Sequence, residues 1–385
     1  MRERLALPLI IFCQLLGTSL WFSVNGVWLP LAHEKQLSEA DLGAFTLAVQ
    51  LGFIVGTLTL ALTGMADRYR ASRIFLWACL CGGLFNALFT FGIEYGRLAD
   101  ALRFLTGLSL AGIYPMGMKL VISWVPRYAG TALSWLLAML TLGTALPHSM
   151  RGLTFDFNWQ LPLYASSLLA ICAGLLVGWL GSGPHLPATA SKAALSSGLT
   201  ALKNKNFRAV AIGYFGHCWE LYAFWMLVPL LALQPIVAMN LSLSFLPWLA
   251  FMIIGVGSLG CIFGGKISQY IGGINTARIA LLSSGLICLL YPWLAQLSGW
   301  LVITVLLLWG LTVIADSPQF SALAAQYAPA QGVGSALAVM NAIGFSLTLP
   351  AIAITSHLWS AQNEWVSWWL LPGPVIGIWA MRRLS

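Results

Sequence analysis

Ionisable side chains are rare in this chain, and several of them lie inside long apolar runs. One run contains "GHCWELY", in which His217 and Glu220 are three positions apart, and another contains "IADSPQFS", with Asp316 before Pro318. Residues three apart on a helix share a face. A carboxyl group kept from water favours its neutral, protonated form, so Glu220 and Asp316 are candidate proton carriers. His217 is a candidate relay, because imidazole changes charge near neutral pH.

Each of these residues also has a purely structural interpretation. Either acid could form a permanent ion pair with an arginine or a histidine and so hold helices together. His217 could be a packing histidine whose hydrogen bonds join helices. Both interpretations stay open for each residue at the level of the sequence.

A second pair of polar residues occurs in "LPHSMRG", where His148 and Arg151 are again three positions apart. Together they could attract an anionic group. Arg151 is close to the end of its apolar run, so its guanidinium could equally extend to the membrane interface. Polar groups within apolar runs are expensive and are candidates for function. The others that we assign to a substrate or coupling site are Gln14, Trp21, Asn25, Arg103, Tyr114 and Asn341.

The elements that position these residues follow from the composition. The chain has 385 residues, of which 59% are hydrophobic and only 8% charged, whereas a soluble domain has about 25% charged residues. Its surface must therefore face lipid, and the long apolar runs predict an all-α integral membrane protein. We predict twelve spans, at residues 6–31, 41–63, 74–94, 98–122, 130–152, 160–181, 208–233, 243–264, 276–297, 300–322, 332–356 and 365–381.

The basic residues set the expected orientation. With the N-terminus inside, fourteen lysines and arginines fall in inner segments and two in outer loops. This bias predicts that both termini are cytoplasmic and that the chain crosses the inner (plasma) membrane several times. The net charge of +8 is thus a topology signal, and we expect no nucleic-acid partner, because the basic residues are scattered over separate loops.

Two halves are indicated by the longest connection and by a repeated segment. Residues 182–207, rich in Pro, Ser, Ala and Lys, predict a cytoplasmic linker between six-helix bundles at 1–181 and 208–385. The charged segment "GMADRYRASR" at 64–73 follows the second predicted span, and "GGKISQYIGG" at 264–273 follows the eighth. The equivalent positions of these segments indicate related halves.

The topology and these segments resemble the major facilitator superfamily. Its G-x-x-A-D-R-x-G-R-R-like motif is similar to residues 64–73, and its Arg-x-x-x-Gly pattern matches Arg103 and Gly107. The resemblance implies two six-helix bundles that rock about a central solute site, with the first, fourth, seventh and tenth spans lining it. It also implies a conformational latch on the inner face, formed by Asp67, Arg68 and Arg73. The segments around residues 111–119, 217–222 and 315–321 loosely resemble the nitrate, nitrite and cyanate carriers.

We therefore predict a secondary active transporter that is proton-coupled and moves a small polar or anionic solute. The slight excess of basic over acidic residues in the spans favours the anion. An exporter of amphipathic compounds on the same fold, or a carrier-like receptor that moves nothing, are the alternatives. We expect no enzyme, since the chain has no metalloprotease, nucleophile-elbow or Walker sequence. We expect no cofactor or metal, an ion gradient as the driving force, and a monomer in the bilayer.

Overall fold

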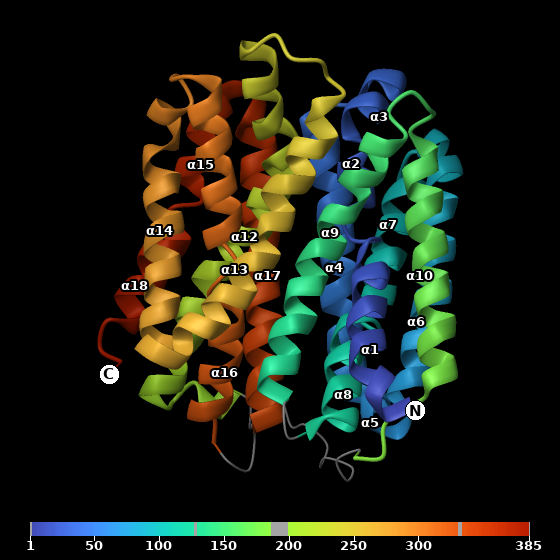
Figure 1. Ribbon diagram of the computed structural model, residues 1–385, viewed down its shortest axis with the longest axis vertical. Coiled ribbons are helices and arrows are strands. Elements are labelled where there is room, and N and C mark those ends of the chain that lie inside the picture. Colours follow the sequence, from blue (N-terminus) through green and yellow to red (C-terminus); the bar gives the residue numbers. More distant parts are fainter. Residues whose placement is uncertain (1, 127–128, 186–198, 330–332, 385) are drawn as a thin grey trace. The chain divides into compact units, whose positions relative to one another are not determined.

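The structure is a computed structural model that describes residues 2–126, 129–185, 199–329 and 333–384 (Figure 1). Helices account for all the regular secondary structure of these residues, as the apolar runs predicted. The elements are α1 (Arg2–Thr18), α2 (Ser23–Gly26), α3 (Trp28–Lys35), α4 (Glu39–Thr63), α5 (Met65–Arg68), α6 (Ala71–Gly92), η1 (Ile93–Tyr95), α7 (Arg97–Leu110), α8 (Tyr114–Trp124), α9 (Ala129–Leu153), α10 (Gln160–Leu180), α12 (Lys205–Ala238), α13 (Phe245–Ile271), α14 (Gly273–Leu294), α15 (Gly299–Thr312), α16 (Ser317–Tyr327), α17 (Val333–Gln362), η3 (Asn363–Trp369) and α18 (Pro372–Met381).

Nine helical stretches of the described residues are long and apolar enough to cross a membrane, so the chain is a multi-pass membrane protein. The last stretch, Val333–Met381, covers both the eleventh and the twelfth predicted spans. The first and fifth predicted spans correspond to α1 and α9, which are not among the nine. The number twelve therefore stays a prediction.

The chain divides into two compact units. The first contains Met1–Val27 and Phe45–Ala194, and the second contains Trp28–Ala44 and Leu195–Ser385. The boundary after Ala194 falls within the predicted linker 182–207, of which residues 186–198 lie outside the described part of the chain. Residues 28–44, which we had placed in the first bundle, group with the second unit, because α3 and the start of α4 pack there.

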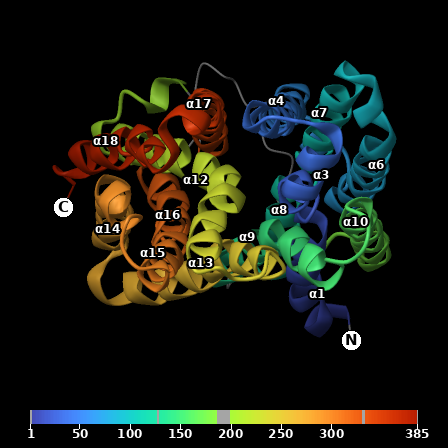
Figure 2. The same cartoon turned by 90° about the horizontal axis from the view of Figure 1, so that it is seen from above.

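Within the second unit, α12 is the central helix. Seen from above, it is flanked by α13, α16 and α17 (Figure 2), and α18 also packs along it. Its residues from Glu220 to Ala232 are all buried. A helix that is apolar on all sides belongs in a protein core or in a membrane, and here other helices pack along it. The side chains that it contributes are therefore held on several sides by other helices.

Close helix packing through glycine occurs at the same place in each unit. A methyl group on Gly107 of α7 would overlap the carbonyl oxygen of Val49 in α4. In the second unit, a methyl group on Gly310 of α15 would overlap the carbonyl oxygen of Ile253 in α13. Small residues let the backbones of membrane helices approach closely. The two contacts occupy equivalent positions in the two halves, which supports the predicted relation between them.

Both units also contain a broken helix directly after this contact. In the first unit α7 ends at Leu110 and α8 begins at Tyr114, with Pro115 in its first turn. In the second unit α15 ends at Thr312 and α16 begins at Ser317, with Pro318 in its first turn. Proline has no N–H to donate and fits best at the start of a helix. The break in the second unit is thus a turn at residues 313–316, directly before the helix that contains Pro318.

The first predicted span is also interrupted. We expected a continuous helix over residues 6–31, but α1 ends at Thr18, and turns at residues 19–22 and at Val27 separate α1, α2 and α3. Hydrophobicity predicts how long a membrane segment is, but it does not report where neighbouring polar groups let the backbone leave the helix.

The glycine contact leads to a first prediction. Gly310→Val should force α13 and α15 apart and lower the free energy of unfolding by about 1–3 kcal/mol, the usual cost of overpacking. Thermal melting of the purified protein in detergent measures this effect. Gly334→Val is the matched control, because the Cβ position of Gly334 has open space around it. Equal melting temperatures for the two variants would contradict the close contact.

Candidate transport site

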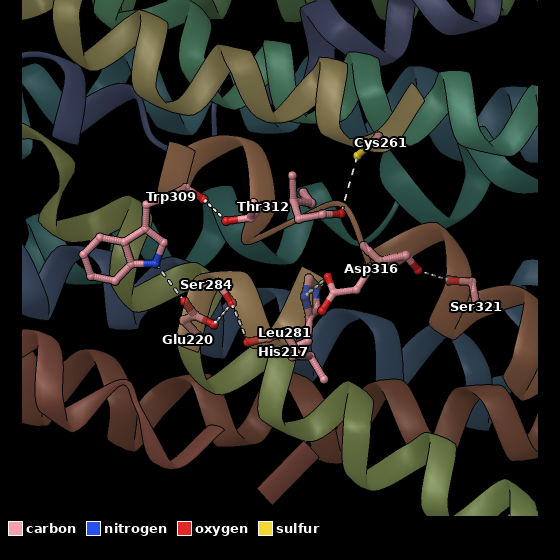
Figure 3. A network of polar contacts seen from close by, with 11 residues as sticks. His217, Glu220, Cys261, Leu281, Ser284, Trp309, Thr312, Asp316 and Ser321 are labelled. Carbon is pink, nitrogen blue, oxygen red and sulfur yellow. Dashed lines mark hydrogen bonds and ion pairs between the residues drawn. The ribbon is translucent and has the colours of Figure 1, made fainter. Parts of the chain in front are cut away.

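A histidine and an aspartate meet in the middle of the second unit. His217 is on α12, and Asp316 is in the turn between α15 and α16 (Figure 3). The imidazole Nδ1 lies 2.7 Å from a carboxylate oxygen of Asp316, and both residues are buried. The rings of Tyr214 and Phe320 lie about the imidazole, with centroid distances of 6.0 and 5.9 Å. The two predicted candidates therefore form one buried pair.

Glu220, one turn along α12 from His217, has a different environment. Its carboxylate accepts hydrogen bonds from the indole N–H of Trp309 at 2.7 Å and from the hydroxyl of Ser284 at 2.9 Å (Figure 3). The thiol of Cys288 donates a third hydrogen bond at 3.3 Å. These donors come from α14 and α15, so the carboxylate connects three helices. Hydrogen bonds of this kind stabilise a buried charge.

The first unit has its own buried charge, Arg103 on α7. Its guanidinium donates to the carbonyl oxygens of Leu20 (3.4 Å) and Trp21 (2.8 Å), which lie in the turn between α1 and α2. It also donates to the side chains of Ser23 (3.2 Å) and Asn86 (2.9 Å). Among the described residues no carboxylate pairs with Arg103, so backbone and amide oxygens compensate its charge.

The other basic residues of the spans are held in a similar way. Arg151 donates to the carbonyl oxygens of Thr154 (3.0 Å) and Phe157 (2.9 Å), beyond the end of α9. Lys119 of α8 donates to the carbonyl oxygen of Ala66. Together with Arg103, these are the side chains whose charge favoured an anionic solute. Because their N–H groups already bind backbone oxygens, the excess of basic residues in the spans gives less support to an anionic solute than the sequence alone suggested.

The three candidate residues of the first predicted span are separated by the break in the helix. Trp21 donates from its indole N–H to Gln50 at 2.8 Å, and Asn25 donates to Thr46 at 3.3 Å, so both bind α4. Gln14 remains on α1 and is buried, and within the described structure its side-chain amide has no hydrogen-bond partner.

Three further predicted residues lie apart from these groups. His148 on α9 is buried, and its Nε2 has no partner among the described residues. Tyr114 is half-buried at the start of α8, directly after the break in its span. Asn341 is half-buried on α17. The structure thus brings together His217 with Asp316 and Arg103 with the backbone of Trp21.

Comparison with known proteins decides the family. The family model of the Major Facilitator Superfamily matches residues 9–380, nearly the whole chain. The chain belongs to the Major Facilitator Superfamily. This is a family of membrane transporters, so a small-molecule substrate is expected of it, and the resemblance seen in the sequence is confirmed.

Individual members of the superfamily agree with this assignment. Over 152 residues the chain is 27% identical to the 3-(3-hydroxy-phenyl)propionate transporter of Escherichia coli (strain K12), an alignment that spans 39% of this chain and 37% of that relative. The chain thus matches little more than a third of that relative's length. The narrower likeness to nitrate, nitrite and cyanate carriers is not shown by these matches.

Solved structures of transporters share the superfamily fold. A bacterial homologue of the human lysosomal transporter Spinster, in an inward-facing and unoccupied conformation, aligns with a TM-score of 0.71 at 12% identity and covers 99% of this chain and 94% of its own. The nucleoside transporter NupG aligns with a TM-score of 0.71 at 14% identity and covers 99% and 98%. At these identities the likeness shows the fold alone.

The residues of the superfamily motif after the second span are only partly described. Arg68 and Arg73 are exposed, at α5 and at the start of α6. The side chain of Asp67 lies outside the described part of the structure. The latch that the motif implies therefore stays a prediction.

The sequence analysis missed the partners of the buried charges. Ser284 and Cys288 lie on α14, and Asn86 lies on α6, in the ninth and third predicted spans, which are not among the four expected to line the solute site. These partners are neutral, so a search for ionisable groups passes over them. The signal in the sequence was Ser284 and Cys288 four positions apart, which places them on one helix face. Trp309 carries no such signal, because tryptophan is also typical of membrane interfaces.

The Arg103 contacts lead to a second prediction. Arg103→Leu removes four hydrogen bonds to buried oxygens, and each oxygen that is left unpaired costs about 1–3 kcal/mol. Purified Arg103→Leu should therefore melt at a clearly lower temperature than the unmodified protein. Arg97→Leu is the control, since Arg97 is exposed at the start of α7. An unchanged melting temperature for Arg103→Leu would mean that these contacts do not stabilise the first unit.

Proposed function

We propose that this protein is a secondary active transporter in which the pair of His217 and Asp316 couples solute movement to a proton gradient. The observation that carries the proposal is the 2.7 Å separation of the two side chains at the break between α15 and α16. A broken helix is where membrane transporters place ion and substrate sites. Buried ionisable groups on such an element are the ones that mark proton pathways.

The chemistry of the pair supports coupling. At this distance a protonated imidazole and a carboxylate would compensate each other's charge. One added proton changes the charge of the buried pair by +1, which is expensive in a site of low dielectric constant. An anionic solute that binds together with the proton offsets this added positive charge. A solute that binds without the proton leaves the charge of the pair unchanged and gains no such compensation. The pair therefore favours the movement of proton and anionic solute together.

Glu220 suits a structural role better. Three donors from two other helices surround its carboxylate, and removing a partner from such a network is destabilising. The His217–Asp316 pair, by contrast, joins α12 to the turn between α15 and α16. We therefore assign proton coupling to Asp316 and His217, and the connection of α12, α14 and α15 to Glu220.

The proposed solute is a small polar or anionic molecule. Support for an anion comes from the relative in Escherichia coli, whose name gives an aromatic carboxylate as its substrate. It also comes from the positive charge that an added proton gives to the His217–Asp316 pair. Gln14 and His148 are buried and retain hydrogen-bonding atoms without partners in the described structure. They are thus two of the predicted site residues with capacity to bind a polar solute.

Proteoliposomes with an imposed pH gradient test the coupling. With labelled 3-(3-hydroxyphenyl)propionate as the solute, Asp316→Asn should lower gradient-driven uptake about tenfold or more, because the neutral amide cannot take up a proton. Exchange of solute across the membrane without a gradient should persist. Glu220→Gln should lower the melting temperature and keep the dependence on the gradient.

The control for this experiment is Asp156→Asn, at an exposed position in the loop after α9. It should transport at the level of the unmodified protein. Gradient-driven uptake by Asp316→Asn at that same level would refute coupling through Asp316. If the unmodified protein does not take up this solute, a thermal-shift screen against metabolites identifies one for the same test, because a ligand that binds the folded state raises its melting temperature.

The latch motif gives a separate prediction. Asp67→Asn should slow solute exchange several-fold and leave the melting temperature unchanged, because a latch acts on the rate of conformational change rather than on stability. Arg73→Gln should have an effect in the same direction. Exchange rates equal to those of the unmodified protein in both variants would mean that the charged segment serves only to orient the chain in the membrane.

A further inference from the structure

A cavity of about 580 Å³ lies at one end of the second unit. Its walls come from α3, the start of α4, the end of α12, the connection between α14 and α15, and the junction of α17 with η3. Its volume is within the range of small-molecule sites. Gln234, which lines it, is fourteen residues beyond Glu220 on α12, or about 21 Å at 1.5 Å per residue. The cavity is therefore separate from the candidate transport site.

The charge of this cavity has one sign. Its ionisable lining residues are Glu39, the first residue of α4, and Glu364, in the first turn of η3. Among the described residues that line the cavity, none is a lysine, arginine or histidine. Within the described residues, neither carboxylate forms an ion pair. Two carboxylates that face one partly enclosed space without a cation make its potential negative.

A chain of hydrogen bonds holds one of these carboxylates in place. The buried hydroxyl of Tyr291 donates to the amide oxygen of Gln234 at 3.1 Å. The amide nitrogen of Gln234 in turn donates to the carboxylate of Glu364 at 3.5 Å. Tyr291 thereby fixes which end of the amide faces Glu364. The carboxylate is oriented from the core of the unit rather than left to move freely on the surface.

The remaining walls are aromatic and apolar. Trp28 and Trp359 line the cavity and are nearly buried, and Leu230 and Val302 add aliphatic surface. Indole faces attract cations, above all those whose charge is weakly hydrated. A negative potential together with indole walls is the environment that organic ammonium ions prefer over inorganic cations, which need several oxygen ligands.

We infer that this cavity binds an organic cation with an aromatic or branched apolar body, at a site distinct from that of the transported solute. Glu39 and Glu364 provide the opposite charge, and Trp28 and Trp359 provide the surface for the body of the ligand. The site is built from the ends of helices, so a ligand there contacts α4, α12 and the segment after α17 at once.

Calorimetric titration of the purified protein tests this inference, with benzyltrimethylammonium as the probe. Phenylmethanesulfonate, which has a similar shape and the opposite charge, is the matched ligand control. The cation should bind with 1:1 stoichiometry, and the sulfonate should bind at least tenfold more weakly. The double variant Glu39→Gln, Glu364→Gln should lose about tenfold or more in affinity for the cation, because both carboxylates are neutralised without a change in shape.

Glu34→Gln is the matched protein control, since Glu34 is an exposed acid on α3 that pairs with Lys35 and does not line the cavity. It should bind the cation as the unmodified protein does. Melting curves verify that the variants are folded. Equal affinity of the double variant and the unmodified protein, equal binding of cation and sulfonate, or no binding of the cation would each overturn the inference. None of these outcomes depends on the transport assay, so the proposed function is tested separately.

Discussion

A buried polar group in a membrane protein must find its partner inside the protein, because lipid offers none. Most of the architecture around the candidate site follows from this constraint. Carbonyl oxygens lie in the turn between α1 and α2, and the guanidinium of Arg103 binds them. The end of α9 has carbonyl oxygens beyond it, and Arg151 binds those. In this protein the buried arginines mainly donate hydrogen bonds to backbone carbonyl oxygens that lie outside the helices.

The same constraint separates the two acids of the second unit. Glu220 is surrounded by donors on α14 and α15 and so is part of the connection between helices. Among the described residues Asp316 has His217 as its side-chain partner, and it lies in the turn directly before α16. A group with fewer fixed partners can change its protonation state at lower cost to the surrounding structure. The difference between these acids lies in their neighbours and not in their own chemistry.

The two halves share the same arrangement of a close glycine contact followed by a helix break. Gly107 against Val49 and Gly310 against Ile253 bring the backbones of two helices into contact, and each contact is followed by a break that ends at a proline. Close packing holds the part of the span before the break, so that the residues of the break have defined positions. The polar residues differ between the halves, with tyrosine before the proline in one and aspartate and serine in the other. The helix packing is the same in both halves, whereas the polar residues at the break differ between them.

The sequence by itself determined the membrane class, the helical fold, most span positions and the family, because long apolar runs leave the backbone few alternatives. It also singled out His217, Asp316, Glu220 and Arg103, since an ionisable group in an apolar run is conspicuous. It did not determine which of them would pair. Ser284, Cys288 and Asn86 are neutral, so they do not stand out in an apolar run. Their roles depend on which helix face lies opposite them.

Only the tertiary structure decided those partners, together with the interruption of the first span and the grouping of residues 28–44 with the second unit. It also placed Glu39 and Glu364 in one cavity although they are far apart along the chain. The physical reason is the same in each case. Hydrophobic periodicity is a local property of a segment, whereas a hydrogen-bond partner, a helix break and a cavity wall are set by segments that meet only after folding.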